Sequence, residues 1–66
     1  MLSARNQFKG TIKSITKGAV MAEVVVQVGE IEVVAVITRG SVEAMKLKEG
    51  DTVTAVIKAT EVMVAN

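Results

Sequence analysis

The stretch AVMAEVVVQVGEIEVVAVIT, residues 19–38, decides the fold, because it consists of two apolar runs joined by a short polar connection. Both runs are rich in valine and isoleucine, whose β-branched side chains favour extended backbone. Gly29 and Glu30 separate the runs by two residues, a spacing typical of a β-hairpin. We therefore predict two antiparallel strands, at residues 19–28 and 31–38.

The same β-branched bias extends over the whole chain, in which thirteen of the 66 residues are valine and five are isoleucine. Outside the hairpin we predict strands at residues 8–16, 52–58 and 61–64 and a short helix at residues 41–47. Gly10 in the first strand marks a bulge or a point of close backbone approach. Five short strands with a helix between the third and fourth are the order of a small Greek-key barrel of the OB type, an order that SH3-like barrels largely share. We therefore predict one all-β domain over residues 1–66.

Both faces of the predicted hairpin are apolar. Val24, Val25 and Val26 are consecutive, and residues 33–37 are five apolar residues in a row. An antiparallel sheet with one face in water alternates polar with apolar residues. A chain of 66 residues has no second layer to cover the other face, so we expect contact with further copies in a homo-oligomer. The alternative is a monomer whose additional valines lie singly on the surface, which is common in proteins.

The composition excludes several classes of function. The chain has no cysteine and no histidine, which rules out disulfides, thiolate zinc sites and imidazole chemistry. Eight basic and seven acidic residues give a net charge of +1, whereas a general nucleic-acid binder needs a marked basic excess. No apolar run approaches the roughly 20 residues that span a bilayer, and the N-terminus has no signal-peptide h-region. We expect a soluble cytoplasmic protein with no nucleic-acid partner and no membrane contact.

The residues also argue against an enzyme. The seven carboxylates are spread along the chain, mostly beside turns, and no nucleophile has an activating base with an orienting partner. Nor is there a clustered acidic loop that could hold a hard cation. What remains is a set of hydroxyls, backbone N–H groups and cations, which together suit an anion.

Residues 38–41 combine the features of an anion site. A strand ends at Thr38, Gly40 frees the backbone, and Ser41 stands where the helix is predicted to begin; helix N-termini attract anions. The alternative is that Ser41 is an N-cap that binds nothing beyond its own helix. Lys58 and Arg5 are further candidates, although a lysine at a strand end also protects a sheet edge and a lone arginine is an ordinary solvated charge.

Four segments together resemble one known family, the Mop proteins or molbindins. They are SARNQFKGTI (residues 3–12), AEVVVQVG (22–29), ITRGSVE (37–43) and LKEGDTVTAVIKATEVMVA (47–65). The same module is found in the TOBE domains of molybdate-responsive regulators and molybdate importers. The resemblance implies an OB-like barrel that shares strands between subunits, and a homohexamer arranged as a trimer of dimers. It also implies molybdate or tungstate bound at the subunit interfaces.

The resemblance assigns the anion contacts residue by residue. The family's SARN motif, Thr-x-x-Ser pair and Lys-Ser/Ala step match this chain at Ser3, Arg5, Thr38, Ser41, Lys58 and Ala59. Where some members have serine, Ala59 has no hydroxyl, so it offers only its backbone N–H. The family's second class of site, near the threefold axis, is not assigned to residues here.

The chemistry of the ligand suits this set. Molybdate carries two negative charges and four acceptor oxygens, so a pocket of donors alone binds it and leaves the hydroxyl of a protonated phosphate without an acceptor. With a single aromatic residue, Phe8, the chain has no shelf for a pterin, and we expect no organic cofactor. The sequence therefore predicts a non-enzymatic protein for molybdate or tungstate storage and homeostasis. The alternatives are an oxyanion-sensing regulatory module that acts on a partner protein and a nucleic-acid-binding OB domain, which normally stacks bases on aromatic residues.

Overall fold

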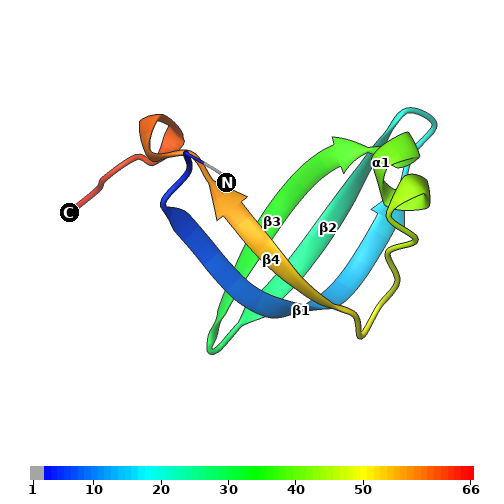
Figure 1. Ribbon diagram of the computed structural model, residues 1–66, viewed down its shortest axis with the longest axis horizontal. Helices are drawn as coiled ribbons and strands as arrows, with labels where there is room; N and C mark the ends of the chain where they lie inside the picture. The colour runs from blue at the N-terminus through cyan, green and yellow to red at the C-terminus, as the bar shows by residue number, and fades with distance from the viewer. Residues whose placement is uncertain (1–2) are drawn as a thin grey trace.

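The computed structural model describes residues 3–66 and shows one curved antiparallel sheet (Figure 1). The sheet has four strands in the order β3-β2-β1-β4, and a short helix follows β3. The elements are β1 (Asn6–Lys17), β2 (Met21–Val28), β3 (Ile31–Thr38), α1 (Arg39–Ala44), β4 (Thr52–Ile57) and the 3-10 turn η1 (Ala59–Glu61). The predicted hairpin is confirmed as β2 and β3, which pair from Val28 with Ile31 to Met21 with Thr38.

β1 pairs with two different strands along its length and bends between them. Residues 6–11 of β1 pair with β4, and residues 11–17 pair with β2. The register shifts between Ile12 and Ser14, which makes Lys13 the extra residue of a bulge; bulges bend the strand that carries them. The Lys13 ammonium forms an ion pair with Glu32 of β3. The bulge therefore lies at Lys13, three residues after Gly10, and not at Gly10 itself.

Gly10 is instead a point of close approach, the second of the two predicted roles. A Cβ atom at this position would overlap the carbonyl oxygen of Gln27 and lie 2.9 Å from side-chain methyls of Val26 and Val28. Contacts this short are not tolerated by a side chain. A glycine is therefore required where β1 crosses β2.

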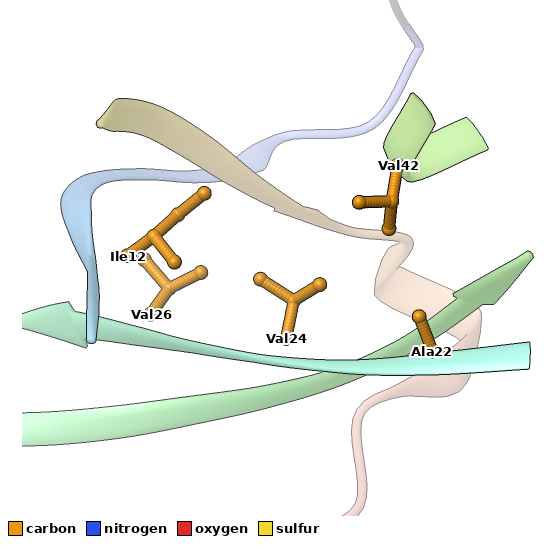
Figure 2. Close-up of a cluster of buried hydrophobic side chains, with 5 residues drawn as sticks. All are labelled: Ile12, Ala22, Val24, Val26 and Val42. Atoms are coloured by element: carbon orange, nitrogen blue, oxygen red, sulfur yellow. The ribbon is translucent and has the colours of Figure 1, made fainter. Parts of the chain in front are cut away.

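A small apolar core fills the inner side of the curved sheet (Figure 2). Its buried members come from β1, β2 and α1 and are Ile12, Ala22, Val24, Val26 and Val42. The one buried residue of α1, Val42, places the helix over one end of the sheet. None of the described helices is long and apolar enough to cross a membrane.

The prediction that the hairpin is apolar on both faces is confirmed. Val24 and Val26 point into the core, whereas Val34 and Val36 on the outer face of β3 are 57% and 63% exposed. Val25 pairs with Val34 across the two strands, so the outer face carries a continuous apolar patch. No element among residues 3–66 covers this patch.

The helix begins two residues earlier than predicted and ends three residues earlier. Thr38 is the N-cap, with extended backbone at φ −71° and ψ 147°, and its side chain accepts a hydrogen bond from the Ser41 N–H. Ser41 is therefore inside the first turn and is not the cap. At the other end, the Lys46 N–H donates to the Glu43 carbonyl and the Leu47 N–H to the Val42 carbonyl. This pair of bonds is a Schellman motif, which ends the helix.

The predicted fifth strand at residues 61–64 is wrong for the single chain. η1 follows β4 and turns the C-terminal residues away from the sheet (Figure 1). Val62 keeps extended backbone, but Met63 and Val64 are each 93% exposed and pair with no strand among residues 3–66. A β-strand exists only where a partner edge is within hydrogen-bonding distance, and this segment has none in the described part of the chain.

Lys46 stores backbone strain that a single substitution relieves. Its φ of 54° lies in the left-handed region, which the C′ position of a Schellman motif requires and which glycine adopts at lower cost. We expect Lys46→Gly to raise the free energy of unfolding by about 0.5–1 kcal/mol, measured by urea denaturation. The control is Lys46→Ala, which removes the charge but keeps the Cβ atom; an equal gain in both variants would show that backbone conformation is not the cause.

Candidate functional site

The six predicted site residues form two groups at different ends of the sheet. Asn6 pairs with Ile57, so Arg5, directly before β1, and Lys58, directly after β4, lie at the same end of the sheet. Figure 1 shows the start of β1 and η1 at this end of the sheet. Ser3, Arg5, Lys58 and Ala59 therefore gather there, and we call them the cation group.

The cation group carries two positive charges that no acid neutralises. Arg5 and Lys58 are both exposed, and the ion pairs found among residues 3–66 involve neither of them. The Ala4 carbonyl accepts a hydrogen bond of 2.8 Å from the Gln7 side-chain amide, which holds the segment just before β1. Two free cations on adjacent strand ends create a positive surface that attracts an anion.

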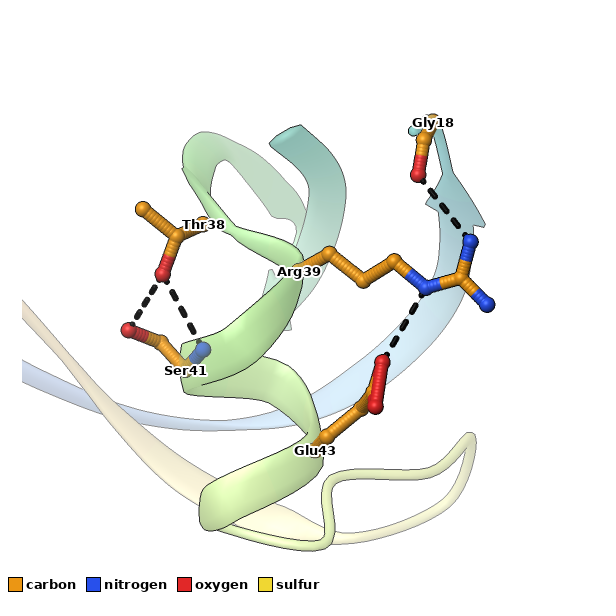
Figure 3. Close-up of polar contacts among 5 residues, drawn as sticks. All are labelled: Gly18, Thr38, Arg39, Ser41 and Glu43. Carbon is orange, nitrogen blue, oxygen red and sulfur yellow. Dashed lines mark hydrogen bonds and ion pairs between the residues drawn. The ribbon is translucent and has the colours of Figure 1, made fainter. Parts of the chain in front are cut away.

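Thr38 and Ser41, which we call the hydroxyl pair, lie at the start of α1 (Figure 3). The Ser41 N–H donates to Thr38 Oγ1 at 3.0 Å, and the Thr38 hydroxyl donates to Ser41 Oγ at 2.7 Å. A hydroxyl has one proton, so Thr38 uses its proton inside the pair. The proton of Ser41 is left to donate to an acceptor outside it.

Arg39 stands between the two hydroxyl residues in the sequence, but its charge points elsewhere (Figure 3). Its Nε donates to Glu43 Oε1 at 3.0 Å and its Nη1 to the Gly18 carbonyl at 3.3 Å. Its backbone N–H donates to the Val20 carbonyl at 2.8 Å, so the start of α1 is attached to the turn between β1 and β2. The hydroxyl pair consequently offers neutral donors only.

The full length of β1 separates the two groups. Thr38 pairs with Met21, and the neighbouring Ala22 pairs with Lys17 at the C-terminal end of β1. The cation group adjoins Asn6, at the other end of this 12-residue strand. One copy of the chain therefore does not bring the six predicted residues into a single pocket.

Sequence reasoning missed two contributors to this geometry. Arg39 and Glu43 have the i,i+4 spacing of a helical ion pair. Their contact could therefore have been predicted from the sequence. Gln7 gave no signal, because a hydrogen bond from a side chain to a nearby carbonyl follows no periodic pattern. Residues 3–66 contain no group of three or more acidic, cysteine or histidine side chains that could hold a metal ion directly.

Comparison with known proteins identifies the family. The family model of the TOBE domain matches residues 2–64. The chain belongs to the TOBE domain family. This TOBE domain is also 47% identical to molybdenum-pterin-binding protein 3 of Clostridium pasteurianum over 64 residues, which are 96% of this chain and 94% of that protein.

Solved structures agree with this assignment. A molybdate binding protein from Sporomusa ovata matches the TOBE domain with a TM-score of 0.97 at 45% identity, over 100% of this chain and 98% of that one. The cytoplasmic molybdate-binding protein ModG, in a form with molybdate bound, matches with a TM-score of 0.86 at 43% identity, over 89% of this chain and 43% of that one. The resemblance to Mop proteins and the OB-like fold predicted from the sequence are thus confirmed.

Proposed function

We propose that this TOBE domain binds molybdate or tungstate as the intact oxyanion and is not an enzyme. The observation that carries the proposal is the likeness over the whole chain to the Sporomusa ovata molybdate binding protein. The residue set supports it, because the two groups supply two free cations and three hydroxyls without a carboxylate among them. Such a set matches an acceptor-only dianion, and charge-assisted bonds from Arg5 and Lys58 would provide most of the affinity.

We further propose that the ligand is inorganic, with no organic cofactor. A pterin ring binds best against an aromatic face, and the one aromatic residue, Phe8, lies on β1 and is 37% exposed. The relatives' names include both molybdenum and pterin, whereas the donors of this chain suit the oxyanion alone. Storage and homeostasis of the anion in the cytoplasm are the role that fits a binding site without a reactive group.

Each anion site, we propose, is shared between two copies of the chain. The cation group and the hydroxyl pair lie at opposite ends of β1, so the cation group of one copy can meet only the hydroxyl pair of another around one ligand. Repetition of this contact around a symmetry axis that closes gives a homo-oligomer of defined size. The resemblance to the Mop proteins favours a homohexamer built as a trimer of dimers.

Strand sharing would hold the copies together. β3 and β4 each have a free edge within the described chain, and unpaired edges seek a further strand. Between them lies an open groove of about 550 Å³, lined chiefly by residues 33–37 and 55–58. The exposed tail, residues 62–66, begins with extended backbone at Val62 and is apolar up to Ala65, which suits it to the groove of a second copy.

The oxyanion proposal is tested by titration calorimetry with sodium molybdate, sodium tungstate and sodium sulfate. We expect heat from the first two salts and a decrease of about 10- to 100-fold in molybdate affinity for Arg5→Ala, since a charge-assisted bond is lost. Lys9→Ala, which removes one positive charge from the middle of β1, is the matched control and should bind as the wild type does. Absence of heat from both metal oxyanions would contradict the function; an unchanged Arg5→Ala affinity would contradict only the role of Arg5.

Site sharing is tested by mixing two defective variants. Ser41→Ala removes the outward hydroxyl but keeps the N-cap bond, and Arg5→Ala removes a cation. Each variant alone should bind molybdate weakly. When the two are refolded together and pair at random, about half of the dimers contain one copy of each variant, and one of the two sites in such a dimer has both groups intact. Mixing should therefore restore about a quarter of the wild-type sites. If both groups served one chain, mixing would restore nothing.

Strand sharing is tested at Val64, which is highly exposed and pairs with none of the described strands. Proline has no N–H for a ladder, so Val64→Pro should lower the subunit number seen by native mass spectrometry, or shift dissociation to higher protein concentration. Val64→Thr keeps the N–H and the β-branched shape and should leave assembly unchanged. A proline variant that assembles as the wild type does would show that the tail is not a shared strand.

A further inference from the structure

We propose that Gln7 is a positioning residue for the anion site, acting through Arg5; this inference rests on the proposed function. The Gln7 Nε2 donates to the Ala4 carbonyl oxygen at 2.8 Å. The bond closes a small loop over residues 4–7 and anchors the segment that precedes β1. Neither the family match nor the predicted anion contacts assign a role to Gln7.

The bond is the main restraint on this segment. The ladder between β1 and β4 begins at Asn6, so residues 3–5 have no strand pairing. Among the hydrogen bonds found within residues 3–66, the bond from Gln7 is the one that reaches residues 3–5. Without it, the backbone that carries Ser3 and Arg5 keeps no hydrogen bond within residues 3–66, and the partial burial of Ala4 is what remains to restrain it.

The restraint acts directly on Arg5. The carbonyl oxygen of Ala4 and the amide nitrogen of Arg5 belong to the same planar peptide unit. Gln7 therefore orients the plane from which the Arg5 backbone continues. Ala4 is half-buried while Ser3 and Arg5 are exposed, so the same orientation presents both predicted anion contacts to solvent.

Orientation matters because a second cation is nearby. Arg5 and Lys58 directly flank the last ladder pair, Asn6 with Ile57, so the adjacent ends of β1 and β4 carry one cation each. Two free cations in adjacent positions repel each other, and a flexible segment would let Arg5 move away from Lys58 in the absence of ligand. The apparent affinity for an anion falls in proportion to the fraction of molecules in the competent conformation. Gln7 raises that fraction without contacting the anion.

The test is a substitution that removes the donor and keeps the shape of the side chain. We expect Gln7→Met to weaken molybdate binding by roughly two- to tenfold, the range for one hydrogen bond, with unchanged subunit number and melting temperature. Gln27 provides a matched control, because its Nε2 also donates to a carbonyl, that of Gly29, at 2.8 Å. Gln27→Met, near the end of β2, should bind molybdate as the wild type does.

Two further measurements separate positioning from a general structural effect. In an Arg5→Ala background, Gln7→Met should cause a smaller loss of affinity than in the wild type, because the residue through which it chiefly acts is gone. In the free protein, the heteronuclear NOE of the Arg5 amide should fall in Gln7→Met and not in Gln27→Met. An unchanged affinity, an equal loss in the Arg5→Ala background, or an Arg5 amide as ordered as in the wild type would each overturn the role of Gln7. Failure of the wild type to bind molybdate and tungstate would instead contradict the proposed function, and the role of Gln7 with it.

Discussion

β1 forms hydrogen-bonded ladders with two strands, β4 along residues 6–11 and β2 along residues 11–17, and the rest of the structure depends on this double pairing. The bulge at Lys13 bends β1 close to the point where the ladder with β4 ends and the ladder with β2 begins. Gly10 lets the backbone of β2 approach closely just before that bend. The resulting curvature encloses Ile12, Val24 and Val26 in a core that a flat four-stranded sheet could not form.

The same pairing explains why two strand edges of the sheet are unpaired within residues 3–66. Because β1 uses both of its edges, β3 and β4 become the outer strands of the sheet, and each keeps one free edge. The chain also leaves apolar residues exposed on the outer face of β3 and in its C-terminal tail. In the proposed assembly, contact between copies would cover this surface and would also complete the donor set of the anion site. The same contact between subunits would then be needed both for stability and for anion binding.

Part of the candidate site could be predicted from the sequence. Thr38 and Ser41 are three residues apart, a spacing that brings side chains together at the first turn of a helix, and the structure joins their hydroxyls. Their roles could not be assigned in advance, because the extended backbone of Thr38 makes it the cap and leaves Ser41 with the free proton. The juxtaposition of Arg5 and Lys58 depends on the register of β1 with β4, which links residues more than fifty positions apart in the sequence.

The sequence by itself determined the β-hairpin, the strand composition and the apolar character of both hairpin faces, because alternation, β-branching and two-residue turns are local properties of the chain. Only the tertiary structure decided the position of the bulge, the start of α1 at Arg39 and the absence of a fifth strand in the single chain. It also decided that the cation group and the hydroxyl pair lie at opposite ends of one strand. These features depend on which edges meet and in which register, and pairing between distant segments leaves no periodic signal in the residues themselves.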